Sequence, residues 1–299
     1  NSAGGTGSAG FPYVFKDDDV IVVRYTVTNF SSTASLSPQI RGVNAISSVT
    51  GKTNSGTAFT ANGTYTDTLT ATADGSHLMY ADGNTGSYTI SDFEIVSHSS
   101  NGFVETWYDQ SGNSNDAVQE TAGSQPKIVS AGSLISKGLD FDGTDDFLQL
   151  DAALGATNAQ SIFGVVELDA LDGSTELILD NRDGGGDGSA YFAASNQFRY
   201  LFDSNSPLAQ LSASTDTSLV SAFKTSSDVA IGIDGGTLDT ASNTETLSVT
   251  TAPRIGSRSF SSGALFFAGE IAELVLYNTD KSADRTAVET NINSHYSLF

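Results

Sequence analysis

Residues 102–150 read GFVETWYDQSGNSNDAVQETAGSQPKIVSAGSLISKGLDFDGTDDFLQL and hold the only tryptophan of the chain, Trp107. Tyr108 follows it, and then comes a polar run, residues 109–116, whose side chains can hydrogen-bond to their own backbone. A run of this kind predicts an irregular but structured loop. We therefore expect the rest of the chain to close as β-sheet around this segment.

The segment FDGTDDFLQL, residues 141–150, contains a strong short hairpin signal. It predicts a strand that ends at Phe141 and a tight turn at Asp142-Gly143. Residues 147–150 are then expected to return as the second strand of the pair.

The motifs WYDQSGNSNDA, QPKIV and FDGTDDFL, residues 107–117, 125–129 and 141–148, resemble the opening of concanavalin A-like (laminin G-like) jelly rolls. Such domains are found in bacteriophage structural proteins and in secreted bacterial surface proteins. FFAGEIAELVLYN, residues 266–278, with the short helix predicted after it, is similar to the closing strand and tail of the same group. The resemblance implies a jelly-roll fold for residues 103–299 and implies little about function.

The composition is typical of an all-β protein. At 299 residues the chain is long enough for one large or two medium domains with a sizeable core. Gly, Ser, Thr, Asn and Asp are abundant while Lys, Glu and Leu are scarce, which favours many short strands joined by turns. Cysteine is absent, which excludes a disulfide, a thiolate metal site and a cysteine nucleophile.

The formal net charge of −22, with only 13 Lys and Arg, argues against nucleic-acid binding, because phosphate contacts need clustered basic residues. The acidic side chains are expected to form a solvated, self-repelling surface that can also gather divalent cations. No apolar run approaches membrane length and no signal-peptide pattern occurs, so we expect no membrane insertion. Because the chain starts at Asn1 and not at Met, we expect a processed product or part of a longer protein.

The chain is expected to contain a leader and two domains. Residues 1–10 lack large apolar side chains and should form a flexible leader. Residues 11–98 resemble a small carbohydrate-binding-module-like jelly roll, with NGTYTDTLTATADGSHLMY and GSYTISDFEIVS as its late strands. Residues 99–299 form the expected concanavalin A-like unit after a short linker, HSSNG. The predicted fold class is therefore all-β, with two tandem antiparallel β-sandwiches and a short C-terminal helix.

Alternation of apolar and polar residues predicts which strand faces of the first unit are buried. The core-facing residues of the strand at 20–28 are expected to be Ile21, Val23, Tyr25 and Val27. Near residues 88–96 the apolar parity changes, which predicts a β-bulge at Ser91-Asp92. In modules similar to this unit, an aspartate of the final strand often helps to hold a structural calcium, and Asp92 matches that position. An exposed strand aspartate is the alternative.

Three patterns describe the interior of the second unit. Residues 161–168 are apolar on both faces, which predicts a strand inside the sandwich. Alternate aromatic residues place Tyr200 and its neighbours in register on one face of a strand at 197–202. The chain should close with a helix capped by Ser282. Its apolar stripe is expected to consist of Val288, Ile292 and Tyr296.

Glu167, Asp169 and Asp172 resemble the E-x-D-x-x-E strand of jelly-roll β-glucanases, in which alternate carboxylates act as nucleophile, orienting group and general acid. Here the third carboxylate is the shorter Asp and Gly173 follows it, so a strand end with solvated acids is the favoured interpretation. YDQSG also resembles a segment of fungal α-L-arabinofuranosidases, whose cysteines and carboxylate motif have no match here. The histidines form no catalytic or metal-binding pair in the sequence and are His77, His98 and His295.

Two kinds of candidate binding residue remain. Aromatic side chains at a loop rim can stack on sugars, and the candidates are Trp107, Tyr108, Tyr191 and Tyr200. A tryptophan before a turn, such as Trp107, more often fills the end of the core. Two acidic loops can wrap a calcium ion, and their carboxylates are Asp142, Asp145, Asp146, Asp183 and Asp187. Neither loop has the ligand spacing of an EF-hand, so plain turns are the favoured interpretation.

The function expected from these observations is that of a non-enzymatic virion structural protein of a bacteriophage. A tail fibre, a head fibre or a capsid decoration protein on the virion surface fits the resemblance, with binding to host-surface glycans. Its expected partners are other virion proteins and further copies of itself. One alternative is a secreted glycoside hydrolase that uses Glu167 and Asp172, and another is an extracellular cellular adhesin or filament subunit.

Overall fold

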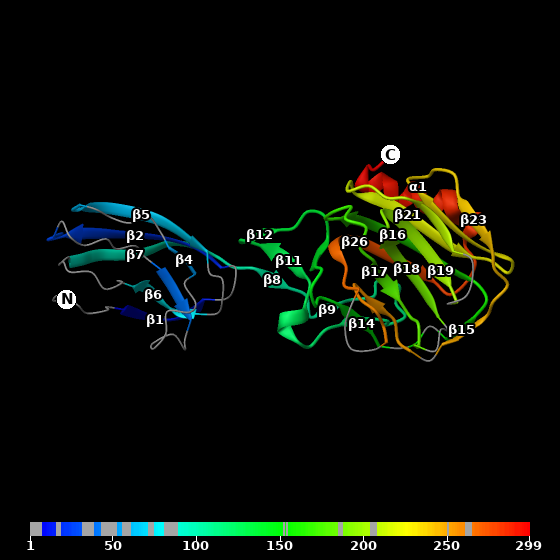
Figure 1. Ribbon diagram of the computed structural model, residues 1–299, viewed down its shortest axis with the longest axis horizontal. Helices are drawn as coiled ribbons and strands as arrows, with labels where there is room; N and C mark the ends of the chain where they lie inside the picture. Colours follow the sequence, from blue (N-terminus) through cyan, green and yellow to red (C-terminus); the bar gives the residue numbers. More distant parts are fainter. Residues whose placement is uncertain are drawn as a thin grey trace. The chain divides into compact units, whose positions relative to one another are not determined.

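A computed structural model describes the chain at residues 8–15, 19–31, 39–42, 53–55, 61–70, 75–80, 89–151, 153, 155–184, 188–203, 208–249, 251–260 and 265–299. The chain divides into two compact units (Figure 1). One comprises Asn1–Gly102 with Val129–Leu134, and the other comprises Phe103–Ile128 with Ile135–Phe299. Within the described ranges both units are antiparallel β-structure, and no helix there is long and apolar enough to cross a membrane.

The first unit contains two antiparallel sheets. One has the strand order β1 (Ser8–Phe15), β6 (Gly75–Tyr80), β3 (Gln39–Gly42) and β4 (Thr53–Ser55). The other has the order β5 (Gly63–Thr70), β2 (Val20–Thr28) and β7 (Thr89–Ser99). Along β2 the predicted alternation is confirmed, because the fully buried residues are Ile21, Val23, Tyr25 and Val27. Tyr25 is further anchored by its hydroxyl, which donates to the Asp67 carboxylate at 2.8 Å, and by stacking on Tyr65.

The predicted bulge in β7 is also confirmed. Ser91 lies opposite Thr26 of β2 and Glu94 lies opposite Arg24, so the register shifts between these two pairs. Asp92 lies within this shift and adopts a φ of 52°, a left-handed conformation that is uncommon outside glycine. The extra residue turns the Asp92 side chain into solvent.

The second unit is a sandwich of two larger sheets. The β18 sheet has the order β20 (Ala209–Ser212), β19 (Gln197–Phe202), β18 (Ser189–Ala194), β17 (Glu176–Asp180), β25 (Arg254–Ile255), β14 (Leu148–Leu150), β10 (Ala117–Val118) and β9 (Thr106–Trp107). The β16 sheet continues from β11 (Lys127–Ser130) through β13 (Leu139–Asp142), β26 (Ala268–Tyr277), β16 (Gln160–Leu168), β21 (Ser218–Lys224) and β22 (Asp228–Ile233) to β23 (Asp239–Ser242). The short strands β8 (Gly102–Phe103) and β12 (Ser133–Leu134) pair with β11, and β15 (Gly155–Thr157) pairs with β24 (Leu247–Val249). A 3₁₀ turn, η1, spans Ala122–Ser124.

Strand β16 lies in the interior of the sandwich, as predicted. Its inner face, with Ile162 and Val166, belongs to the core between the two sheets. Its outer face, with Phe163 and Val165, packs in a second apolar cluster that includes Ile292 of the C-terminal helix. Apolar residues on both faces are therefore buried by a sheet on one side and by a helix on the other.

The predicted hairpin at Asp142-Gly143 is wrong. Strand β13 pairs with β11 and β26, whereas β14 pairs with β10 and β25, so the two strands belong to opposite sheets. Gly143 does form the turn, with a φ of 71°. Residues 143–147 then carry the chain across the sandwich, because Phe141 and Leu148 both lie fully buried in the one core between the sheets.

The C-terminal helix α1 (Arg285–Tyr296) follows a 3₁₀ turn, η2 (Ser282–Asp284). The predicted cap is wrong, since Ser282 opens the 3₁₀ turn and Asp284 occupies the N-cap position without a side-chain cap bond. The Ser282 N–H donates instead to the Asp280 carboxylate at 2.8 Å. The predicted stripe is confirmed, because the helix residues that pack on the β16 sheet include Val288, Ile292 and Tyr296.

Phe141→Ala should lower the free energy of unfolding of the second unit by about 3–5 kcal/mol, because it opens a cavity between the sheets. Urea unfolding followed by the fluorescence of Trp107, the only tryptophan, measures this unit. Phe299→Ala removes a ring that is 54% exposed and is the matched control, with an expected change below about 0.5 kcal/mol. Equal losses in the two variants would contradict the placement of Phe141.

Candidate functional site

The loop after β9 is structured by hydrogen bonds from its own side chains, as predicted. The Asp109 carboxylate accepts hydrogen bonds from the Ser111 N–H at 2.7 Å, the Ser111 hydroxyl at 2.8 Å and the Asn115 N–H at 3.0 Å. The Asp109 N–H in turn donates to Asp116 Oδ1 at 2.8 Å. The backbone donors of Asn115 and Ser111 lower the pKa of Asp109 to about 2, so the carboxylate that organises the loop stays ionised.

The four aromatic candidates for sugar contact do not lie together. Tyr108 is 66% exposed at the start of the rigid loop, while Trp107 packs against the sandwich core behind it. Tyr191 and Tyr200 are wholly buried, so their selection as surface aromatics is wrong. Their positions on β18 and β19 face the core because strand residues alternate, and the Tyr200 hydroxyl donates to buried Gln160 at 2.8 Å. Tyr108 is the candidate that a sugar ring can reach.

The crossover after β13 brings three carboxylates together. One oxygen from each of Asp142, Asp145 and Asp146 lies within 4.8 Å of the others. Each carboxylate also serves the loop, because Asp142 accepts the Thr144 N–H at 2.7 Å, Asp146 accepts the Asp142 N–H at 3.0 Å and Asp145 accepts the Ser124 hydroxyl at 3.0 Å. Burial, aided by the neighbouring carboxylates and opposed by the bond from the Asp142 N–H, raises the pKa of Asp146 to about 7. A carboxylate offers about four lone-pair positions, so these bonds leave oxygen sites for a cation.

The other proposed calcium ligands do not form such a group. Asp92 is exposed on the β7 bulge, where its carboxylate accepts the Ser91 hydroxyl at 3.1 Å. Asp183 is exposed after β17, and Asp187 lies outside the described residues. Within the part of the chain that the structure describes, the trio at the crossover is the group of three acidic side chains close enough to share one ion.

The carboxylates of the glucanase-like motif are separated by the end of a strand. Glu167 points from the outer face of β16, where the Lys137 ammonium and the Thr217 hydroxyl both donate to it. Asp172 lies beyond β16 in the following loop and accepts the Ser174 N–H at 2.7 Å. There it lines a shallow pocket together with Glu176. The two acids therefore do not project as alternate residues of one strand, and a strand end with engaged acids is what the geometry provides.

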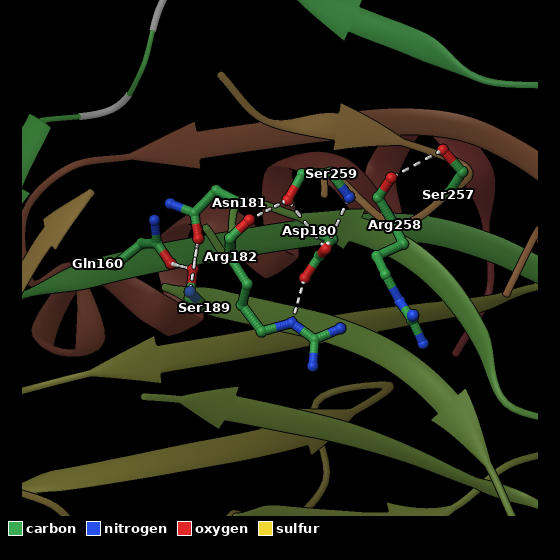
Figure 2. Close-up of polar contacts among 8 residues, drawn as sticks. All are labelled: Gln160, Asp180, Asn181, Arg182, Ser189, Ser257, Arg258 and Ser259. Carbon is green, nitrogen blue, oxygen red and sulfur yellow. Dashed lines mark hydrogen bonds and ion pairs between the residues drawn. The ribbon is translucent and has the colours of Figure 1, made fainter. Parts of the chain in front are cut away.

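A buried carboxylate organises the outer face of the β18 sheet (Figure 2). Asp180 ends β17, is fully buried, and pairs through one oxygen with Arg182 Nε. Its other oxygen accepts the Ser259 N–H at 2.8 Å and the Ser259 hydroxyl at 3.0 Å. Arg254 of β25 is the cross-strand neighbour of both Asp180 and Gln149, and its Nε donates to Gln149 at 2.9 Å. These bonds to Asp180 and Gln149 therefore fix the segment 254–260 against the ends of β17 and β14.

Sequence reasoning missed these arginines. Arg182 lies in the NRDGGG loop, in which the sequence pattern draws attention to the aspartates and not to the arginine. Arg254 and Arg258 are spaced four apart, which in an irregular loop gives no periodic signal. Basic residues are scarce in this chain, and this scarcity is a signal that could have identified the arginines. Three of the 13 Lys and Arg, namely Arg182, Arg254 and Arg258, lie in two short segments rich in glycine and serine.

No protein-family model and no curated protein matches the chain. Among solved structures, Trypanosoma rangeli sialidase in complex with sialic acid is similar over 63% of this chain and 31% of its own, at 18% identity and a TM-score of 0.45. A heptameric SAP-like pentraxin from Limulus polyphemus is similar over 50% of this chain and 78% of its own, at 12% identity and a TM-score of 0.41. The receptor binding domain of botulinum neurotoxin D is similar over 63% of this chain and 52% of its own, at 10% identity and a TM-score of 0.43. The chain thus spans less than a third of the sialidase.

Asp146→Asn should remove part of the pH dependence of the second unit's stability. The folded-state pKa of about 7 lies above the ordinary value of 3.8, so the folded state binds this proton more tightly than the unfolded chain does. The stability that Asp146 contributes is therefore fully present below about pH 4 and is lost as the pH rises through about 7. Urea unfolding in the presence of chelator measures this effect. As the pH rises from about 4 to above 7, the free energy of unfolding of the variant should increase relative to that of the wild type, by about a few kcal/mol. Parallel pH profiles would disprove the raised pKa.

Proposed function

We propose that the chain is a non-enzymatic structural protein of a bacteriophage particle, a tail fibre, head fibre or capsid decoration protein, whose second unit binds host-surface glycans. The observation that supports glycan binding is Tyr108, which is 66% exposed at the edge of a loop that Asp109 holds in one conformation. An exposed aromatic ring on a rigid support can stack on a sugar face at little cost in conformational entropy. The placement in a phage particle rests on the sequence resemblance of the second unit.

The proposal includes no catalytic turnover. Glu167, the acid that a glucanase-like mechanism would need as nucleophile, is engaged by Lys137 and Thr217 on the outer face of the sheet. The proposed structural role also implies a location and partners. The protein would lie on the virion surface or outside the cell, and its partners would be other particle proteins and further copies of itself.

We further propose that the crossover loop binds a structural calcium ion through Asp142, Asp145 and Asp146. The three carboxylates lie close enough to share one ion, and hard oxygen ligands of this kind suit calcium. The ion would compete with the proton on Asp146 and would offset the mutual repulsion of the trio. It would thereby stabilise the segment that joins the two sheets.

Tyr108→Ala should abolish binding to a defined sugar on a glycan array probed with purified protein, because the variant loses the stacking ring. Stacking contacts of this kind change affinity by roughly 1–3 kcal/mol, or about 5- to 150-fold, which takes a weak lectin-like interaction below what the array detects. Phe299→Ala, which removes another exposed ring, is the matched control and should bind as the wild type does. A folded wild type that binds no glycan, with or without calcium, would overturn the glycan-binding part of the proposal.

Calcium at about 1 mM should raise the melting temperature of the wild type by a few degrees, since an ion that binds only the folded state stabilises it by mass action. Asp145→Asn should remove this shift, because it takes one carboxylate from the trio, and it should keep the fold because Asp145 is exposed. Asp183→Asn changes an exposed aspartate outside the trio and should keep the shift. Equal calcium responses in both variants would disprove this site.

A further inference from the structure

Four arginines of this acidic chain lie on or beside one surface of the second unit. The chain has 13 Lys and Arg against 35 Asp and Glu. The arginines that lie on or beside the outer face of the β18 sheet are Arg182, Arg199, Arg254 and Arg258. Arg182 forms an ion pair with the buried carboxylate of Asp180. We refer to Arg182, Arg254 and Arg258 as the arginine cluster.

Aromatic rings hold the guanidinium groups of the arginine cluster in place. The Arg182 and Arg258 guanidinium carbons lie 5.6 and 5.1 Å from the centroid of the same ring, Phe260. The Arg254 guanidinium lies over Phe147 at 4.4 Å. Figure 2 shows the Arg182 and Arg258 guanidinium groups turned to the same side. Stacking orients each planar group while leaving its edge donors available to a ligand.

Arg258 carries hydrogen-bonding capacity that the protein does not use. Its Nε has no hydrogen-bond partner in the described part of the chain, and the same holds for Arg199 Nε, although both of these atoms are closed to solvent. A buried guanidinium N–H without an acceptor is unfavourable, and an arginine has five such donors in a fixed planar fork. Arg254 donates through Nε to Gln149 and through one terminal nitrogen to the Arg258 carbonyl, and Arg182 donates through Nε to Asp180. These bonds fix the arginines in place, and a ligand would contact the terminal N–H groups that they leave over.

We propose that the arginine cluster binds the carboxylate groups of an acidic polysaccharide, which deepens the glycan-binding part of the proposed function and rests on it. A carboxylate matches the planar fork of a guanidinium and accepts two parallel hydrogen bonds from it. The net charge of −22 repels polyanions at a distance, but at physiological salt this repulsion is screened beyond about 8 Å. Contacts at the arginines, which are partly shielded from solvent, are screened much less. A neutral glycan can accept single hydrogen bonds through its hydroxyl groups, but it lacks the charged planar acceptor that matches the guanidinium fork.

The test measures binding of immobilised polygalacturonate to the purified full-length chain in 0.15 M NaCl with chelator, by biolayer interferometry. Arg258→Gln should bind at least about tenfold more weakly, since it removes one charge-assisted contact. Arg258→Lys keeps the charge without the fork and should recover only part of the affinity. Arg24→Gln removes an equal charge from an exposed ion pair with Glu94 in the first unit and should bind as the wild type does. Unchanged thermal melts would show that each variant is folded.

Two further arms separate the sources of binding. Neutral dextran should not bind, and dextran sulfate should bind more weakly than polygalacturonate if the planar carboxylate is what the guanidinium recognises. No wild-type binding to polygalacturonate, or binding that Arg258→Gln leaves unchanged, would overturn the inference, as would binding of dextran sulfate alone. A third outcome separates the two proposals. If the wild type binds a neutral glycan that Tyr108→Ala no longer binds, and neither protein binds polygalacturonate, the proposed function stands and the arginine site is rejected.

Discussion

The second unit depends on one crossing of the chain from sheet to sheet, between Phe141 and Leu148. Both residues are fully buried in the core, yet they belong to strands of opposite sheets. Phe141 also packs edge-on against Phe267, with ring centroids 6.0 Å apart. Because the crossing ties both sheets to one core, the positions of β13, β14 and their partners follow from it. The turn at Gly143 allows the change of direction that this requires, since its φ of 71° suits glycine.

Several carboxylates of this protein accept hydrogen bonds that fix the conformation of its loops. Asp109 and Asp142 each accept backbone N–H groups of residues that follow them, and so act as local turn caps. Asp180 does the same across the fold by binding Ser259 and pairing with Arg182. The abundance of aspartate and asparagine is thereby explained in part by loop geometry. Two places combine such bonds with groups that a ligand could use, the trio at the crossover and the surface of the arginine cluster.

The two outer faces of the second unit differ in charge. On the β16 sheet, Asp140 and Glu167 each lie opposite Glu270 on the neighbouring strand, which places like charges side by side. Burial and the neighbouring acids raise the pKa of Glu270, and Lys137 with Thr217 lower that of Glu167 against the effect of burial. On the other side of the sandwich, Arg254 lies in β25 of the β18 sheet, and Arg182 and Arg258 lie in loops after β17 and β25. Each sheet thus exposes a different surface although the core between them is shared.

The sequence by itself determined the features that depend on neighbouring residues. Strand alternation in residues 20–28, the bulge at Ser91-Asp92, the self-bonded loop after Tyr108 and the helix stripe ending at Tyr296 were all predictable, because each is written in local spacing. The all-β sandwich class followed from the same patterns and from the resemblance.

Only the tertiary structure decided which strands become partners and which faces are covered. The Asp142-Gly143 turn is compatible with a hairpin and with a crossover, and pairing with the distant strands β25 and β26 selects the crossover. Tyr200 is aromatic in either environment, and only the opposing sheet makes it a core residue. The arginine cluster joins Arg182 to residues more than seventy positions away, around Phe260. Such choices depend on contacts between remote segments, whose burial energy no local pattern contains.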